Sequence, residues 1–255
     1  MPDPQIPASG SLSLLSLGYR GLEAWREARG TDWIESRRRE AAALAASDAA
    51  AADDDAPALS PDLEIVVVTG LPRSGTSMLM QMLRAGGVAP FTDGARTPDE
   101  SNPRGYLEHD RAKALPADTA WLAGADRRAV KVVAPLATFL PEGPAYRVVL
   151  IERDVYEVIR SQARMLERGG RVSGDAATLR EVYRQQLDRT RAWMRAAPRT
   201  RGLQVLHRTA IADPAAVAER LARLLDGAAA LGGRPFDTAA AAAAVDPSLH
   251  REHAP

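Results

Sequence analysis

A short loop between two apolar runs carries residues whose types and spacing suit phosphate chemistry. The β-branched run at 65–69 stops at Gly70, and Gly75 stands directly before a second, helix-like apolar run. A loop of this kind turns successive backbone N–H groups toward one point, and the following helix aims its positive end at the same point. The segment therefore predicts a site for a phosphate or a similar anion.

The positive charge of this loop does not lie where nucleoside triphosphatases place it. Gly70-x4-Gly75 matches their loop spacing, but Thr76 stands where those enzymes have the Lys that grips the β- and γ-phosphates. The cationic residue lies inside the loop instead, as Arg73. A tight strand-to-helix turn without a ligand is the alternative that this segment leaves open when it is taken alone.

The loop sequence resembles a motif of a known enzyme family. Its residues are Pro72, Arg73, Ser74, Gly75, Thr76 and Ser77. This order resembles the 5′-phosphosulfate loop of sulfotransferases, which use 3′-phosphoadenosine 5′-phosphosulfate (PAPS) as sulfuryl donor. The resemblance implies that these six residues close round the 5′-phosphate and that Arg73 contacts the leaving group and the sulfuryl group.

A second segment, 147–161, resembles the 3′-phosphate motif of the same family. In that motif an Arg at a strand end is followed eight positions later by a Ser on the next helix, here Arg153 and Ser161. An Arg supplies a fork of donors and a Ser supplies a hydroxyl, so both can hold one phosphate. The alternatives are an Arg153–Asp154 ion pair with Asp154 as a helix N-cap, and an ordinary surface hydroxyl at Ser161.

The resemblance covers residues 63–250, and the segments 70–87, 102–108 and 245–249 look like a broad bacterial sulfotransferase group whose acceptors are mostly unassigned. It implies transfer of a sulfuryl group to a hydroxyl or amine of a small molecule or carbohydrate, with no metal required. A small-molecule kinase or other nucleotide-dependent phosphotransferase on the same fold is the first alternative. A non-catalytic nucleotide-binding protein is the second.

Sulfuryl transfer needs hydrogen-bond donors where negative charge builds and a base for the acceptor proton. Some members of the family carry a Lys on a strand like 130–134, which makes Lys131 a second candidate donor; a Lys that reaches water past the strand end is the alternative. Glu108 is the preferred base, ahead of Asp93 and then His109. The acceptor pocket is expected along the loop at 92–126, and His207 is expected to be a packed core residue.

Apolar runs alternate with helix-like stretches along the chain. Strands are expected at 65–69, 130–134, 147–152 and 202–207, and helices at 77–85, 154–168, 175–196 and 213–225. Strands that lack a polar face indicate a parallel sheet covered on both sides, so we expect a three-layer α/β P-loop-like fold. Ligands of such sheets bind at the carboxyl ends of the strands, where both motifs fall.

Composition restricts the partners that we expect. Lys plus Arg and Asp plus Glu both number 33, so no global basic field favours nucleic acid. Cysteine is absent, and no apolar run near the start is long enough for a signal peptide or a membrane span, so we expect a cytoplasmic protein without disulfides or membrane partners.

Residues 1–61 are expected to form a helical arm, with helices at 13–29 and 31–47 and an acidic linker, ahead of a catalytic domain at 62–255. A homodimer through this arm, or an arm that covers the acceptor, is one interpretation, and packing of the arm on the protein's own core is the other.

Overall fold

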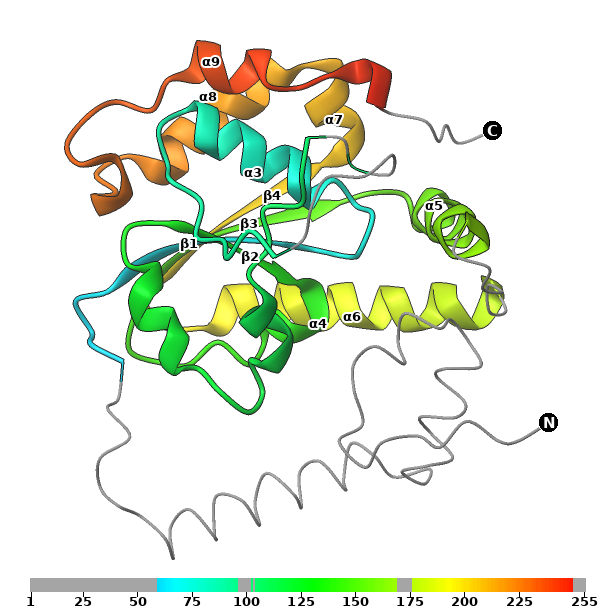
Figure 1. Cartoon of the computed structure of the whole chain (residues 1–255), viewed down its shortest axis with the longest axis horizontal. Coiled ribbons are helices and arrows are strands. Elements are labelled where there is room, and N and C mark those ends of the chain that lie inside the picture. The colour runs from blue at the N-terminus through cyan, green and yellow to red at the C-terminus, as the bar shows by residue number, and fades with distance from the viewer. Residues whose placement is uncertain (1–58, 96–101, 103, 169–175, 250–255) are drawn as a thin grey trace, which may run out of the picture. The chain divides into compact units, whose positions relative to one another are not determined.

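The computed structural model describes residues 59–95, 102, 104–168 and 176–249 (Figure 1). The chain divides into two compact units, one of residues 58–162 with 180–255 and one of residues 1–57 with 163–179. Of the second unit the structure describes only the end of helix α5 (Val155–Arg168) and the start of helix α6 (Ala176–Ala196). The predicted helices at 13–29 and 31–47 and the proposed dimer arm lie outside the described residues.

A four-stranded parallel sheet forms the centre of the larger unit. Its order is β2 (Ala129–Val133), β1 (Glu64–Gly70), β3 (Ala145–Glu152) and β4 (Thr200–Leu206). The central strands β1 and β3 are buried along almost their whole length, which explains why the sequence shows continuous apolar runs there. Gly70 is in register with Val133 of β2 and with Ile151 of β3, so three strands end at the same edge.

Helices cover both faces of this sheet (Figure 1). On one face lie α3 (Thr76–Ala85), α7 (His207–Ala212), α8 (Pro214–Leu225) and α9 (Thr238–Ala243). On the other lie α4 (Ala134–Ala137) and the part of α6 from residue 180 onward, where the Thr190 hydroxyl donates to the Ala134 carbonyl at 2.8 Å. The predicted three-layer α/β architecture is confirmed.

Short helical turns fill several connections. They are the 3₁₀ helices η2 (Asp110–Ala114), η3 (Ala120–Ala125), η4 (Ala229–Leu231) and η5 (Pro247–Leu249). The fourth strand ends one residue earlier than predicted, because His207 is the first residue of α7. No side chain caps α7 at its N-terminus, so the sequence carried no signal for its start.

An ion pair secures the amino-terminal edge of the sheet, opposite the loop. Arg147 on β3 donates to both carboxylate oxygens of Glu64 on β1, at 3.2 and 3.3 Å. The same guanidinium donates to the carbonyls of Leu224 and Asp226 at the end of α8, at 2.6 and 3.2 Å. Because these groups are largely buried, this cluster joins two central strands to a covering helix and keeps the loop's supporting elements in register.

Candidate functional site

The loop between β1 and α3 is packed too tightly for side chains at its two glycines. A Cβ on Gly70 would lie 2.5 Å from the carbonyl oxygen of Ile151 on β3. A Cβ on Gly75 would lie 2.7 Å from the ring of His207, and Gly75 also has a φ of 102°, which favours glycine. The neighbouring strand end and helix start therefore fix the path of the loop.

The start of α3 is arranged as an anion site. Among the described residues no side chain caps this helix, and its first turn contains no acidic residue. The Ser74 hydroxyl is fully buried in the loop and has no hydrogen-bond partner within the described part of the chain. Arg73 adopts a left-handed φ of 68°, a strained conformation for a non-glycine residue of the kind that gathers at ligand sites. An anion at this helix start would meet N–H donors and the positive helix end.

The two motifs that the sequence suggested touch each other. The Arg73 side chain donates from Nε to the Ser161 hydroxyl at 3.1 Å, and Arg153 donates from Nη1 to the Arg73 carbonyl at 3.3 Å. Ser161 is only 6% exposed, so it is not an ordinary surface hydroxyl. The structure therefore brings the guanidinium of the loop, the strand-end Arg and the helix Ser to one place.

Residues of the second motif also hold the start of α5. The Asp154 carboxylate accepts from the backbone N–H groups of Tyr156 and Glu157, at 2.9 and 3.2 Å, which is the N-cap that the sequence offered as an alternative. The ion pair of Arg153 is with Glu157, at 2.7 Å, one helical turn further on. Both side chains are about nine-tenths buried, so this pair orients the Arg153 guanidinium.

Lys131 is a buried cation beside the loop. It is the middle residue of β2, in register with Val68, and only 6% of its side chain is exposed. Its ammonium donates to the Ser77 hydroxyl at 3.0 Å, to the Tyr106 carbonyl at 3.2 Å and to the Glu108 carboxylate at 2.7 Å. The alternative that Lys131 reaches water past the strand end is wrong, because the segment at 106–108 covers it and supplies its anionic partner.

Glu108 lies at the outer end of this cluster. Its side chain is 22% exposed, so its carboxylate contacts both Lys131 and solvent. The Thr92 hydroxyl donates to the Glu108 carbonyl at 2.6 Å and fixes the backbone. The Lys131 ammonium therefore links the Glu108 carboxylate, the preferred base, to Ser77 at the start of α3.

Asp93 and His109 are engaged in packing of their own loop. The Asp93 carboxylate accepts from the backbone N–H groups of Asp110 and Ala95, at 2.6 and 3.0 Å, and chiefly the first of these bonds lowers its pKa below the usual value. His109 accepts at Nδ1 from the Arg111 N–H at 3.3 Å. Its ring stacks on both Phe91 and Trp121, with centroids 4.8 and 4.9 Å away, and these two rings stack on each other at 6.1 Å.

Comparisons with known proteins give similarities to solved structures. No protein-family profile matches the sequence, and no curated protein matches it. The chain is similar to the sulfotransferase domain from the curacin biosynthetic pathway, with 16% identity, a TM-score of 0.41, and coverage of 73% of this chain and 89% of that one. It is also similar to the sulfotransferase domain of the Synechococcus PCC 7002 olefin synthase, with 18% identity, a TM-score of 0.44, and coverage of 76% and 88%. A third similar structure is a sulfotransferase from Alicyclobacillus acidocaldarius, with 14% identity, a TM-score of 0.39, and coverage of 72% and 87%.

Asn102 is a site residue that sequence reasoning passed over. Its amide donates from Nδ2 to the Ser77 hydroxyl at 2.8 Å. The nearby Arg104 donates to the carbonyl of Ala244 and to the carboxylate of Asp246, at 2.6 and 3.1 Å, so it joins two segments that the resemblance had marked separately. The only sign of Asn102 in the sequence was its place at the start of an Asn-Pro-x-Gly turn. Its spacing from the loop gave no reason to expect a contact with Ser77 of α3.

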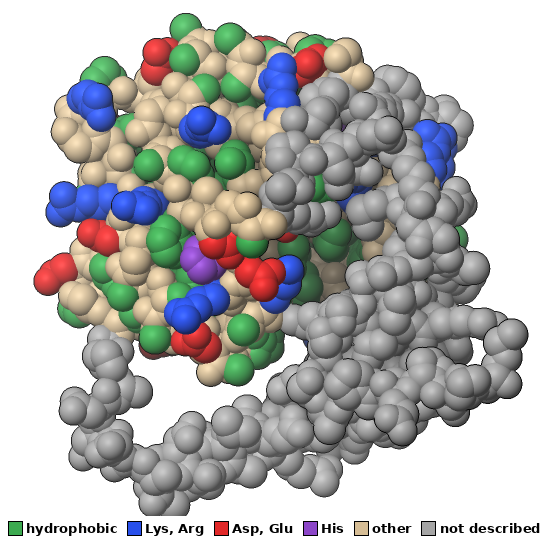
Figure 2. All heavy atoms as spheres, in the orientation of Figure 1, with side chains coloured by type: hydrophobic (Ala, Val, Ile, Leu, Met, Phe, Trp, Pro, Cys, Tyr) green, Lys and Arg blue, Asp and Glu red, His purple; other side chains and the backbone are tan. Residues whose placement is uncertain are grey.

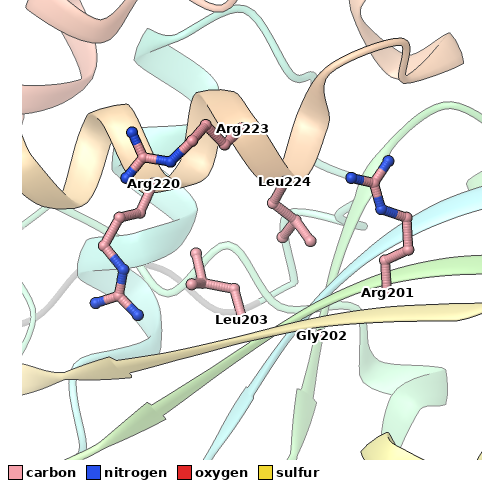
Figure 3. A pocket seen from close by; sticks show the side chains of 6 residues that line it. All are labelled: Arg201, Gly202, Leu203, Arg220, Arg223 and Leu224. Carbon is pink, nitrogen blue, oxygen red and sulfur yellow. The ribbon is translucent and has the colours of Figure 1, made fainter.

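A basic hollow of about 260 Å³ lies away from the loop, between β4 and α8 (Figure 3). Its lining residues are Arg201, Gly202, Leu203, Arg220, Arg223 and Leu224. In Figure 3 the Arg220 and Arg223 side chains extend from α8 on one side, and Arg201 rises from β4 on the other. Arg220 donates to the Gln204 carbonyl at 2.7 Å. Because the hollow uses the amino-terminal half of β4, it is separate from the carboxyl-end site.

The described residues contain neither a membrane span nor a metal cluster. None of the helices there combines the length and the apolar character needed to cross a membrane. No group of three or more His, Asp or Glu side chains in those residues is placed to hold a metal ion.

Proposed function

We propose that this protein is a sulfotransferase that takes the sulfuryl group of PAPS and transfers it to a hydroxyl or amine of a small molecule or carbohydrate. The observation that carries the proposal is the direct contact between the two motifs, in which Arg73 donates to Ser161 and Arg153 donates to the Arg73 carbonyl. A donor with phosphates at both its 5′ and 3′ positions requires two anion sites that lie close together in space.

The two anion sites have different chemical characters. The start of α3, with the N–H groups of the loop and the helix dipole, suits the 5′-phosphate. The Arg153 guanidinium and the Ser161 hydroxyl suit the 3′-phosphate, since charge-assisted bonds from a guanidinium fork are among the strongest that a protein offers to phosphate. Arg73 belongs to the loop of the first site, and its guanidinium donates to the Ser161 hydroxyl of the second.

Sulfuryl transfer then proceeds as an in-line displacement. The acceptor oxygen or nitrogen forms a bond to sulfur, its proton passes to a base, and the bond from sulfur to the 5′-phosphate oxygen breaks. The released product is adenosine 3′,5′-bisphosphate. Arg73 and Lys131 are the cations beside the loop that counter the charge that builds on the sulfuryl oxygens and on the leaving oxygen.

Glu108 is the group best placed to accept the proton. Its carboxylate is partly exposed and is joined through Lys131 to the start of α3. Asp93 has a lowered pKa and already accepts two backbone N–H bonds, so it is a weaker base. The Nδ1 of His109 accepts a hydrogen bond inside its own loop, and its ring stacks on Phe91 and Trp121.

The test is an assay of both products. The protein is incubated with PAPS and a panel of alcohols, amines and carbohydrates, and both adenosine 3′,5′-bisphosphate and the sulfated acceptor are quantified. The proposal expects the two products in equal amounts for at least one acceptor class, and formation of both about a hundredfold or more slower when Arg73 is replaced by Ala. Transfer of phosphate from ATP to the same acceptors, with none from PAPS, would establish the phosphotransferase alternative instead.

A further inference from the structure

The Ser77 hydroxyl is surrounded by groups that can only donate to it. Ser77 is the second residue of α3 and therefore lies at the helix start that we propose as the 5′-phosphate site. Its Oγ accepts from the Lys131 ammonium at 3.0 Å and from the Asn102 amide nitrogen at 2.8 Å. Neither an ammonium nor an amide NH₂ group can accept a hydrogen bond.

This arrangement decides what the hydroxyl can still do. A Ser hydroxyl has two acceptor lone pairs and a single hydrogen. Because Lys131 and Asn102 together occupy both lone pairs, the hydrogen is the part of Ser77 that remains for a further bond. The hydroxyl is therefore preset as a donor, and a group that meets it must be an acceptor such as a phosphate oxygen.

We propose that Asn102 is a positioning residue that, together with Lys131, holds the Ser77 hydroxyl as a donor to the 5′-phosphate bound at the loop. The inference rests on the proposed function in that the loop binds the phosphate of a nucleotide. Without the Asn102 amide, one lone pair of Ser77 is vacated and the hydroxyl can rotate away from the ligand. Binding of the ligand must then fix the orientation of the Ser77 hydroxyl again, and this cost lowers the affinity for the ligand.

Asn102 is held in place by contacts of its own carbonyl and of Arg104. Its carbonyl accepts from the Gly105 N–H at 3.1 Å, and the Arg104 carbonyl accepts from Gln81 on α3 at 3.5 Å. The Arg104 guanidinium is bound to Ala244 and Asp246 near the C-terminal end of the described chain. A segment that the sequence assigns to the acceptor side thus acts directly on the phosphate side of the same site.

The experiment is a double-mutant cycle of Asn102→Leu and Ser77→Ala, read by calorimetry with adenosine 3′,5′-bisphosphate and with adenosine 3′-phosphate. Asn102→Leu removes the donor at similar volume, and Asn102→Ala serves as a second variant. Gln81→Leu is the matched control, because it removes a contact of the same segment that does not reach Ser77. Melting temperatures of all variants are recorded alongside.

Ser77→Ala should weaken binding of the bisphosphate about tenfold or more, since it removes a hydrogen bond to a charged group. Asn102→Leu should weaken it about three- to tenfold, the range of one neutral hydrogen bond, and should leave binding of adenosine 3′-phosphate unchanged. In the Ser77→Ala background Asn102→Leu should have no further effect. Gln81→Leu should leave the ratio of the two affinities as it is.

Other results would overturn the inference. Equal losses for both nucleotides, or an additional loss for Asn102→Leu in the Ser77→Ala background, would mean that Asn102 does not act through Ser77. If the wild type binds ATP but not the bisphosphate, the proposed function fails, and the same cycle is read on ATP against adenosine. An Asn102 effect confined to ATP would then uphold the positioning role, whereas binding of neither nucleotide would overturn both proposals.

Discussion

Arg73 is the residue at which the requirements of the loop and of the chemistry coincide. It takes a left-handed backbone conformation, its carbonyl accepts from Arg153, and its guanidinium reaches Ser161. A strained residue persists only where its surroundings hold it, and here they do so by hydrogen bonds from the second motif. These hydrogen bonds hold the Arg73 side chain at the edge of the sheet where the strands end.

Arg73→Ala should lower the rate of sulfuryl transfer by about a hundredfold or more, the usual effect of removing a donor aimed at developing charge. Donor affinity should fall much less, because the guanidinium matters most in the transition state. Steady-state kinetics with PAPS separates kcat from KM, and Arg73→Lys, which keeps a positive charge, is the control. A near-normal rate for Arg73→Ala would remove this residue from the mechanism.

Arg153 is expected to recognise only one of the two phosphates. Arg153→Ala should therefore reduce the affinity for adenosine 3′,5′-bisphosphate and leave that for adenosine 5′-phosphate nearly unchanged. A charge-assisted bond contributes roughly 1.5–3 kcal/mol, so the ratio of the two affinities should fall by about tenfold or more. Calorimetry measures both. Equal losses would show that Arg153, with its partner Glu157, supports the fold instead.

The Glu108 carboxylate is tested by removing its basicity while keeping its shape. Glu108→Gln should bind donor normally and transfer sulfuryl to a hydroxyl acceptor about a hundredfold or more slowly, the typical contribution of a positioned base. Asp93→Asn is the matched control and should leave the rate close to normal. A rate loss confined to Asp93→Asn would assign the base to Asp93, and normal rates for both variants would make His109 the next residue to test.

Individual residues were predictable where one segment carries the whole pattern. The resemblance pointed to the loop residues, Arg153 and Ser161, because each of its two motifs lies within one strand-turn-helix unit, and the structure brings them into contact. The contacts of Lys131 with Ser77 and Glu108 were not predictable, since they depend on the register of β2 against β1 and on the segment at 106–108 folding over the strand. Asn102 was missed for the same reason.

At the scale of elements, the path of the loop depends on the start of α7 as much as on the loop's own sequence. Gly75 caps α3, and the first residue of α7 lies against it. The short helix α7 follows β4 directly, so the end of an edge strand supports the loop that follows a central strand. Any side chain at Gly75 would have to displace the imidazole of His207.

Gly75→Ala should lower the melting temperature and abolish nucleotide binding, because its Cβ would lie 2.7 Å from His207 at a φ of 102°. Gly87→Ala is the control, since Gly87 has a similar φ of 107° but its Cβ would come no closer than 3.8 Å to Leu231. Overpacking costs about 1–3 kcal/mol beyond the backbone strain that both variants share. Calorimetric unfolding and nucleotide titration of both variants measure the difference, and equal melting temperatures would contradict the packing that we describe.

The long elements were predictable because their patterns are continuous. The apolar strands and the helices α3, α5, α6 and α8 begin and end within a few residues of the predicted bounds. The short elements were not, because a helix such as α7 has neither a cap nor a full amphipathic repeat. The boundary between the predicted arm and the catalytic domain stays a prediction.

At the scale of the whole molecule, positive and negative charges balance, so the sequence has no net charge that would attract an anion from a distance. The chain has 33 basic and 33 acidic residues, and side chains of both signs are interspersed on the face shown in Figure 2. Attraction of a nucleotide therefore depends on the few cations around the loop, Arg73, Lys131 and Arg153. The selectivity for PAPS over ATP that we propose would have to come from the same few groups.

The measurement that tests the central claim most directly is equilibrium binding of adenosine 3′,5′-bisphosphate against ATP, each with and without magnesium. The Arg153 and Ser161 pair and the absence of the loop Lys that ATP-dependent enzymes carry predict that the bisphosphate binds more tightly and that magnesium makes no difference to its affinity. Tighter binding of ATP in the presence of magnesium would contradict the account and assign the loop to a phosphotransferase.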